Sequence, residues 1–402
     1  MQDKIIAILS GLLVLTGCMS LGEPYTEGLN AFSVTAVYPE GYAVRAGAMV
    51  TVESISGGIS YSLTTDSSGS ARTRLPNGIY RVRVTDREGQ NVFNGSQNRV
   101  PVSGSSVEVS VPLLISKAGT LVIKELYCGG CPRDPEEGTY QSDQYVILHN
   151  NDNLPVYLDG LCFGTLSPYN SNAANPWTGA GGALPDFLPI IQAVWAFGGS
   201  GTSFPLGPGE DAVICLRGAI DHTAQYPLSV NLNRPGYFVC YNNVYFPNTT
   251  YHPVPGDQIA RDHYLEVVIK TGQANAYTLS VNSPTFVIFR AQEVDIHDFV
   301  AVPENLVQVP GSSVDRVIAI PEEWVIDGVE VFNGGSSDNH KRLRDSVDAG
   351  YVVLSESFKG RTLMRKVDAE ATAGQGFEIL QDTNNSTEDF YERQTQSLHD
   401  AE

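Results

Sequence analysis

Short segments in which apolar and polar residues alternate, separated by Gly, Pro, Asn or Asp, run through most of this 402-residue chain. Residues 32–38, 49–53 and 79–84 show the pattern most clearly. A period of two places successive side chains on opposite faces of a β-strand, and turn residues about every eight to twelve positions are typical of a β-sandwich. The 39 Gly, 23 Pro and 19 Tyr also suit many short strands joined by turns. The sequence therefore predicts an all-β fold.

Residues 1–17 have the organisation of a signal peptide. Lys4 lies in a short polar start, residues 5–15 form an apolar run, and a small-residue cleavage site ends at Cys18. An apolar run of this length is too short to cross the ~30 Å hydrocarbon layer as a helix. We therefore expect residues 1–17 to be removed during export.

The segment Leu15-Thr16-Gly17-Cys18 resembles the bacterial lipobox. The resemblance implies that Cys18 is acylated and becomes the first residue of the mature protein, which makes the membrane a partner through the lipid anchor. An ordinary signal peptide with a chance cysteine is the alternative. Several acyl chains on one residue hold a membrane firmly, whereas one chain binds weakly. Met19 replaces the Asp that favours the inner membrane, so we expect the outer membrane, with the leaflet left open.

Residues 18–402 exceed what one hydrophobic core comfortably serves, so more than one domain is expected. Composition changes along the chain predict a tether over 18–30, a first sandwich over 31–116, and a second over 119–395. The second sandwich carries long insertions, at about 165–205 and 216–320. A separate third domain over 216–320 is the alternative.

The first of these regions contains a recognisable pair of turns. TTDSSGSA at 64–71 and LPNGIYRV at 75–82 match the turn-and-strand pattern of carboxypeptidase-regulatory-like and prealbumin-like modules. Asp and Gly make one turn in this pattern, and Pro-Asn-Gly makes the next. The resemblance implies a β-sandwich, and it implies no chemistry, because such modules serve many roles.

The order of elements after residue 119 resembles a lamin-tail domain, which is an immunoglobulin-like sandwich. The strings that carry this resemblance are LVIKELY (121–127), DQYVILHN (143–150), LPVYLDGLC (154–162), FPLGPGEDAVIC (204–215), TLMR (362–365) and DTNNSTEDF (382–390). Two departures matter. Gln144 and Ile147 replace the acidic residues of the second strand, and Cys162 replaces the usual Trp. The resemblance therefore implies the fold but no ligand that depends on those acidic residues.

The lipobox, the regulatory-like module and the lamin-tail-like ending together resemble the Bacteroides-type lipoproteins grouped as domain of unknown function 4876. The resemblance extends over nearly the whole mature chain. It implies two immunoglobulin-like or prealbumin-like β-sandwiches in tandem, the second enlarged by insertions. No activity is established for this family, so the resemblance implies no reaction.

The charge of the chain excludes some partners. The formal net charge is −20 at pH 7. Nucleic acids and anionic lipid surfaces are bound through basic patches, so we expect neither as a partner. Acidity of this kind is more often a matter of solubility than of a cation site.

Cysteine usage leaves several interpretations open. Of the six cysteines, five remain once Cys18 is set aside, and an odd number allows at most two disulfides. Cys128 and Cys131 are a candidate disulfide, because the chain is expected outside the cytosol. Buried thiols, metal binding and redox chemistry are the alternatives, and the last would need a strand-to-helix setting that the sequence lacks.

Known catalytic and metal-binding motifs are absent from the sequence. It contains no Gly-x-Ser-x-Gly, no His-Glu-x-x-His and no Gly-rich phosphate loop followed by Lys. The densest His and Asp cluster, at 252–263, is more typical of surface hydrogen bonds than of a metal site. Asp residues at 66–69 and 382–389 could bind calcium, but in turns they bond their own backbone equally well. We expect no enzyme, no metal and no cofactor, with calcium as the open alternative.

The segment from 168 to 205 is rich in aromatic residues set among Asn, Gly, Ser and Pro. Rings on a long loop suit sugar stacking or docking onto a partner, because they supply contact area at little entropy cost. The alternative is that they cover the open end of the sandwich. The candidate binding residues are Tyr169, Trp177, Phe187, Trp195, Phe197 and Phe204.

Three functions remain open from the sequence. The first is a non-catalytic outer-membrane lipoprotein that acts as a binding or accessory module, with a TonB-dependent transporter as the expected partner. The second is a glycan- or ester-directed hydrolase whose carboxylate pair assembles only in the fold. The third is an adhesive or structural surface protein.

Overall fold

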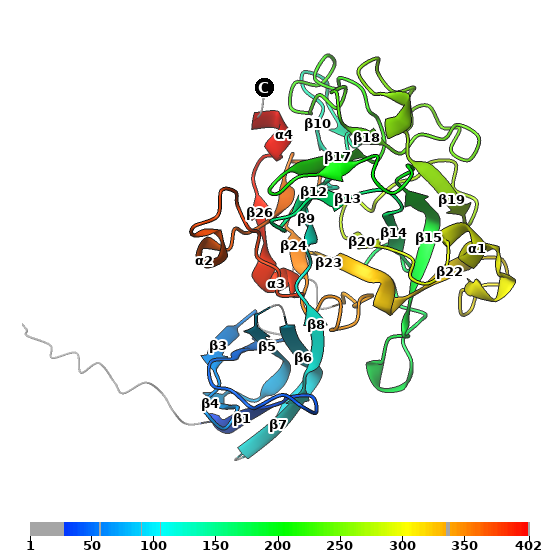
Figure 1. The fold of residues 1–402 in the computed structure, drawn as a ribbon. Helices are drawn as coiled ribbons and strands as arrows, with labels where there is room; N and C mark the ends of the chain where they lie inside the picture. The colour runs from blue at the N-terminus through cyan, green and yellow to red at the C-terminus, as the bar shows by residue number, and fades with distance from the viewer. Residues whose placement is uncertain (1–27, 56–57, 90, 105, 335–337, 401–402) are drawn as a thin grey trace, which may run out of the picture.

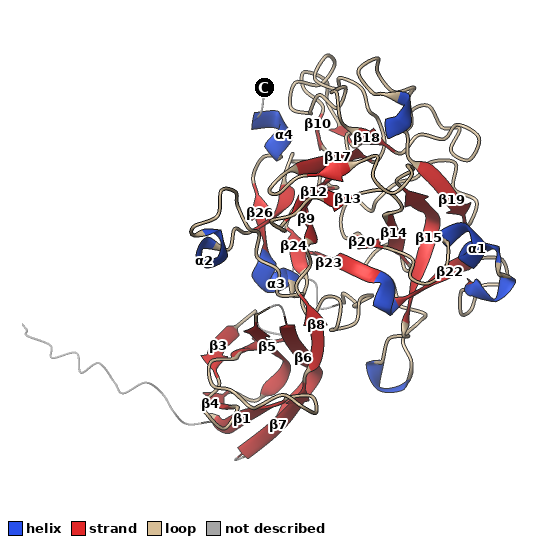
Figure 2. Cartoon of the chain, viewed as in Figure 1, coloured by secondary structure: helices blue, strands red, loops and turns tan. Residues whose placement is uncertain are grey.

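The computed structural model describes residues 28–400, apart from 56–57, 90, 105 and 335–337. The predicted signal peptide, Cys18 and most of the predicted tether lie outside these residues. The described chain forms two units, an N-terminal unit at 30–117 and a C-terminal unit at 121–400 (Figure 1). Figure 2 shows that strands and loops make up nearly all of both units. The predicted all-β, sandwich-type fold is confirmed.

Two sheets form the N-terminal unit. A three-stranded sheet has the order β4-β1-β7, and a five-stranded sheet has the order β3-β2-β5-β6-β8. The strands are β1 (Asn30–Val37), β2 (Met49–Ser54), β3 (Ser60–Thr64), β4 (Ser70–Leu75), β5 (Gly78–Glu88), β6 (Asn91–Val102), β7 (Ser106–Pro112) and β8 (Leu114–Lys117).

Alternation explains how these strands pack. Along β1 every second side chain is buried, and Phe32 and Val34 enter a core shared with β2 and β5. The predicted Asp-Gly turn joins β3 to β4: Asp66 accepts the backbone N–H of Ser68 at 2.9 Å, and Gly69 has φ +73°. A side chain at Gly69 would also collide with Val44, so this turn requires glycine.

Two larger sheets form the C-terminal unit. A six-stranded sheet has the order β18-β17-β12-β9-β25-β26. Its strands are β9 (Leu121–Tyr127), β12 (Tyr145–Asn150), β17 (Asp211–Cys215), β18 (Phe238–Val239), β25 (Thr362–Arg365) and β26 (Phe390–Arg393).

An eight-stranded sheet faces it, with the order β21-β22-β15-β14-β20-β23-β24 and with β19 paired to β15. Its strands are β14 (Cys162–Leu166), β15 (Phe187–Ala196), β19 (Glu266–Lys270), β20 (Thr285–Phe289), β21 (Leu306–Gln308), β22 (Arg316–Pro321), β23 (Val325–Asn333) and β24 (Val352–Leu354).

The remaining elements of this unit are short. Two small two-stranded sheets, β10-β11 and β13-β16, and several single helical turns accompany the main strands. They are β10 (Cys131–Pro132), β11 (Thr139–Tyr140), β13 (Val156–Tyr157), β16 (Pro205–Leu206), η1 (Ala180–Gly182), η2 (Arg261–His263), η3 (Pro303–Asn305), η4 (Glu322–Trp324), α1 (Ile296–Ala301), α2 (Ala369–Thr372), α3 (Ser386–Asp389) and α4 (Ser397–Asp400).

Both faces of each large sheet are covered, which explains why their strands are almost continuously apolar. In β12, Val146 and Leu148 enter the core between the sheets, whereas Tyr145 and Ile147 pack on the outer face. Parts of the 216–265 region, including Val230, supply that outer cover. The outer face of the eight-stranded sheet is covered in the same way by side chains from 296–347. The long insertions therefore bury sheet faces that would otherwise meet water.

Strands from the 216–320 region join the existing sheets of the C-terminal unit. β20 lies between β14 and β23, and β19 pairs with β15. β22 pairs with β15 on the same sheet. In the structure, therefore, this region does not form a sheet of its own.

The two units meet at the loop over 382–386, which leads into α3. Asn94 donates to the carbonyl of Thr383 at 2.7 Å, and Asn385 donates to the hydroxyl of Thr85 at 2.9 Å. Figure 1 shows α3 close to the top of the N-terminal unit, beside β8, which connects the two. The string DTNNSTEDF thus has a structural role, since its asparagines join one unit to the other.

Candidate functional site

The sequence-predicted aromatic cluster does not form one binding surface. Trp195 is fully buried in the core between the sheets, and Phe197 is 2% exposed. Phe204 packs against the same core. These three rings therefore do not form a docking loop: Trp195 lies in the strand β15, and all three pack in or against the core between the sheets.

The other candidate aromatics lie apart from one another. Trp177 and Phe187 make an edge-to-face contact with ring centroids 5.6 Å apart, and both are half-buried. Tyr169 is half-buried, and its hydroxyl is 2.8 Å from that of Thr278. Of the predicted aromatics, Tyr169 alone lines one of the two pockets described below.

The described cysteines are all buried free thiols, so no disulfide joins Cys128 and Cys131 in this structure. Burial raises the pKa of the Cys128 thiol to about 12 and raises that of Cys131 further. A thiol with a raised pKa is a poor nucleophile, because the thiolate is the reactive form. These cysteines are suited to packing in the core.

The candidate metal ligands are occupied by other contacts. Asp66 accepts hydrogen bonds from its own turn, and Asp382 and Asp389 both face the guanidinium of Arg365. Within the described part of the chain, no group of three or more His, Cys, Asp or Glu side chains is arranged to hold a metal ion. His252, from the densest His and Asp cluster, bonds only to backbone groups.

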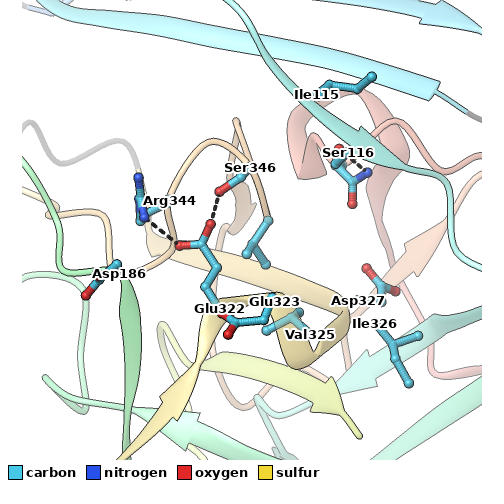
Figure 3. Close-up of a pocket in the computed structure, with 12 residues that line it drawn as sticks. Ile115, Ser116, Asp186, Glu322, Glu323, Val325, Ile326, Asp327, Arg344 and Ser346 are labelled. Carbon is cyan, nitrogen blue, oxygen red and sulfur yellow. Dashed lines mark hydrogen bonds and ion pairs between the residues drawn. The ribbon is translucent and has the colours of Figure 1, made fainter. Parts of the chain in front are cut away.

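A cavity of about 430 Å³, the junction pocket, lies where the two units meet (Figure 3). Glu322 forms an ion pair with Arg344 at 3.2 Å and also accepts the Ser346 hydroxyl. Figure 3 shows the Asp327 carboxylate on the other side of the pocket. This carboxylate pairs with Arg365, which does not line the pocket. Glu322 and Asp327 therefore each have a cationic partner, and they do not face each other as an acid and base pair would.

A second cavity, of about 340 Å³, lies at one end of the C-terminal sandwich. We call it the Arg217 pocket. β14 and β17 end there, and β12 and β20 begin there, so both sheets contribute to its walls. Its lining residues are Gln141, Tyr169, Asn170, Arg217, Tyr251, Thr278, Ser280, Val281 and Asn282.

Arg217 is the distinctive residue of this pocket. Its side chain is held by a hydrogen bond from Nη1 to the Gln141 carbonyl at 2.7 Å and lies over the Tyr251 ring, 4.9 Å from the centroid. It is only 3% exposed, and its Nε has no hydrogen-bond partner. Burial lowers its pKa to about 10, so the guanidinium stays charged at neutral pH. Among the described residues no carboxylate forms an ion pair with it.

One wall of the pocket, the segment 277–279, is held by side chains. They bond to its backbone groups as a neighbouring strand would. His252, Gln192 and Gln144 each bond to the backbone of one residue in the segment 277–279. Gln192, for example, donates to the Thr278 carbonyl at 2.8 Å and accepts its N–H at 3.1 Å. Gln144, which departs from the lamin-tail pattern, bonds to both backbone groups of Leu279. This wall is therefore fixed before any ligand arrives.

His252 makes the wall sensitive to acid. Its Nε2 accepts the Tyr277 N–H at 3.0 Å, and burial lowers its pKa to about 4, below the unfolded value of about 6.5. The folded state thus favours neutral His252, and its stability falls as the pH drops from about 6.5 to about 4. We expect this part of the acid sensitivity, on the order of 2–3 kcal/mol, to be absent from His252→Gln.

Urea unfolding at several pH values, followed by tryptophan fluorescence, measures this effect. All three tryptophans, Trp177, Trp195 and Trp324, lie in the C-terminal unit. The half-exposed His297 is the matched control, and His297→Gln should keep the wild-type pH profile. An unchanged profile in His252→Gln would contradict the assignment.

Sequence reasoning missed Arg217 and Asn170. The signal for Arg217 was slight: a single arginine directly after an apolar strand, in a chain with a large negative net charge. The lack of an ion pair between Arg217 and any described carboxylate is a property of the fold, and no local motif reveals it.

The fold and the pockets define a class: an all-β protein of two sandwich units with a polar pocket at one end of the larger unit. Residues 207–397 match the family described as protein of unknown function (DUF4876). A crystal structure of a DUF4876 family protein from Bacteroides thetaiotaomicron is similar to this chain, with 26% identity and a TM-score of 0.57. The similarity covers 90% of this chain and 94% of that one. The predicted resemblance to DUF4876 proteins is confirmed.

Other comparisons add little. The major pilin subunit of Bacillus cereus matches over 35% of this chain and 43% of its own, with 17% identity and a TM-score of 0.19, which supports no inference. No curated protein matches. In the part of the chain that the structure describes, none of the helices has the length and apolar character needed to cross a membrane.

Proposed function

We propose that this protein is a non-catalytic binding module of the cell envelope, held at the outer membrane by acylated Cys18, with the Arg217 pocket as its ligand site. The observation that carries the proposal is the buried guanidinium of Arg217, which lines an open cavity, has an Nε without a hydrogen-bond partner and forms no ion pair with a described carboxylate. Burying an unpaired charge is unfavourable, so a protein seldom keeps one without a use.

The surroundings of Arg217 favour binding over catalysis. The Ser280 hydroxyl lies in the pocket, but it accepts the backbone N–H groups of Asn282 at 3.2 Å and Ser283 at 3.0 Å. It also donates its proton to Asn170. A hydroxyl bonded in this way is held in place and is not activated by a base. A ligand would meet a fixed, polar surface.

The anchor and the partner are the remaining parts of the proposal. The lipobox at Leu15-Thr16-Gly17-Cys18 supports acylation, and Met19 supports the outer membrane. The resemblance of the sequence to Bacteroides-type envelope lipoproteins supports a TonB-dependent transporter as partner, since many such lipoproteins work beside one.

Affinity purification of the native lipidated protein from detergent-solubilised envelopes tests the anchor and the partner. We expect metabolic palmitate labelling of the wild-type chain, no labelling of Cys18→Ser, and a TonB-dependent transporter enriched with the wild type alone. Equal labelling of the two chains would contradict the anchor, and purification of the lipidated chain without a transporter would contradict the partner.

Thermal shift with small polar ligands, followed by mass spectrometry of the recovered ligand, tests binding without catalysis. A ligand of this pocket should raise the melting temperature and should be recovered chemically unchanged. The shift should shrink in Tyr251→Ala, because the ring forms part of the wall. Recovery of a cleaved product would contradict the proposal and would favour the hydrolase alternative.

A further inference from the structure

The Arg217 guanidinium forms no direct ion pair with a described carboxylate, and the buried Asp143 acts on it only as a nearby charge. Of the guanidinium nitrogens, Nη1 is committed to the Gln141 carbonyl at 2.7 Å, and the described residues provide no acceptor for Nε. The ring of Tyr251 covers one face of the guanidinium, with its centroid 4.9 Å away. A cation held in this way attracts an anion that enters the pocket, and does so strongly because the site is shielded from water.

Asn170 adds a second hydrogen-bond donor of known orientation. The Ser280 hydroxyl accepts two backbone N–H groups, so its one proton must go to Asn170. The Asn170 side chain therefore turns its carbonyl oxygen toward Ser280. Its NH₂ group finds no acceptor among the described residues and is left for a ligand.

The walls of the pocket suit a polyhydroxylated ring. Tyr251 offers an aromatic surface, and Gln141, Thr278 and Asn282 offer polar groups around it. Aromatic and amide side chains together are the usual surroundings of sugars, since rings pack on the carbon faces and amides bond to the hydroxyls. The volume of about 340 Å³ lies at the small end of ligand pockets, which indicates one or two sugar rings.

The net charge of the chain affects which anions can bind in the pocket. The chain carries a net charge of −20, so its surface repels anions in general. An anion bound here must be held by the specific contacts of the pocket.

We infer that the Arg217 pocket binds an acidic sugar, with the carboxylate of a uronic acid residue on Arg217 and Asn170 and its ring against Tyr251. This inference rests on the proposed function, since it names the ligand class of the same pocket. The carboxylate brings a negative charge to the guanidinium, and the neutral sugar of the same shape does not.

Isothermal titration calorimetry of the full chain in detergent tests this inference. The probes are D-galacturonate, its neutral counterpart D-galactose, and inorganic phosphate as a bare anion. We expect D-galacturonate to bind about tenfold or more tightly than D-galactose, because the charge-assisted hydrogen bonds depend on the carboxylate. Phosphate should bind more weakly than D-galacturonate, since it makes no contact with the ring wall.

Two variants locate the binding. Arg217→Gln should lower the affinity for D-galacturonate at least to that for D-galactose. Asn170→Asp should do the same, because it places a negative charge beside the site while keeping the oxygen that accepts from Ser280. Arg261→Gln is the matched control, since Arg261 also stacks on a tyrosine, at 4.8 Å, but lies outside the pocket. Melting temperatures show whether each variant is folded. If Arg217→Gln does not fold, Asn170→Asp still tests the site.

Each other outcome overturns a stated part of the inference. Equal binding of D-galacturonate and D-galactose, weakened by Tyr251→Ala, overturns the anion claim and leaves the proposed binding function intact. Tighter binding of phosphate than of D-galacturonate overturns the claim that the ligand is a sugar. Absence of binding by all three probes, or wild-type binding in both Arg217→Gln and Asn170→Asp, overturns the inference as a whole.

Discussion

Replacement of Arg365 by Met is expected to lower the unfolding free energy of the C-terminal unit by about 3–5 kcal/mol, or to prevent folding. Arg365 is fully buried and pairs with Asp327, with Asp382 at 3.2 Å and with Asp389 at 3.5 Å. Its Nε also donates to the Ile123 carbonyl at 2.8 Å. Without the guanidinium, three buried carboxylates would remain with no cation between them. Urea unfolding monitored by tryptophan fluorescence measures the loss.

Acid should rescue this variant in part. Burial raises the pKa values of Asp327 and Asp389 in the native protein, and the neighbouring Asp382 raises them further, against the opposing effect of Arg365. A carboxyl with a raised folded pKa stabilises the folded state at low pH, and this contribution is lost as the pH rises above about 4, the unfolded value. The difference between Arg365→Met and the wild type should therefore shrink toward acidic pH.

The control for Arg365 is Arg361, which pairs with Glu392 at 3.0 Å near the surface. Arg361→Met should cost less than about 1 kcal/mol, because exposed ion pairs contribute little. Equal costs for the two substitutions, or a penalty for Arg365→Met that grows in acid, would show that the buried cluster does not hold the unit together as described.

Replacement of Glu330 by Met is expected to cost about 3–5 kcal/mol, because it leaves the Arg342 guanidinium buried without its anion. The two side chains are fully buried, and Arg342 Nη2 lies 2.6 Å from Glu330 Oε1. Glu330 also accepts the backbone N–H groups of Arg342 at 2.7 Å and Leu343 at 3.0 Å. Arg342 in turn donates to the Ser283 carbonyl at 2.9 Å, close to the start of β20.

A double-mutant cycle separates the ion pair from the size of the side chains. We expect Glu330→Met with Arg342→Met together to be more stable than the sum of the single losses predicts, since neither charge is then left alone. Urea unfolding of the four proteins gives the coupling free energy. A coupling near zero would mean that the pair contributes only packing.

The N-terminal unit was the part of the fold most open to prediction. Alternation along β1 and the Asp66-to-Gly69 turn are local features, and both appear in the structure as the sequence indicates. β15 was hidden because Pro189 interrupts its apolar pattern, and proline argues against a central strand. Gln192 adds a left-handed residue with φ +66° to the same strand. The loop predicted there is wrong for this reason.

The site was less predictable, because its defining property is that Arg217 lacks an ion pair, and a sequence does not show which pairs are missing. The sequence shows Arg217, but it does not show that none of the described carboxylates forms an ion pair with it in the fold. It shows Asn170, but the orientation of that amide follows from two backbone groups near Ser280. Arg365 gave a better signal, since TLMR and DTNNSTEDF both belong to the resemblance to lamin-tail domains, and the structure brings Arg365, Asp382 and Asp389 together.

A crystal structure of the chain with D-galacturonate tests the assigned site most directly. Our account predicts the sugar in the Arg217 pocket, with its carboxylate about 3 Å from the Arg217 guanidinium and its ring against Tyr251. A sugar bound in the junction pocket or elsewhere on the surface, with the Arg217 pocket unchanged, would contradict it.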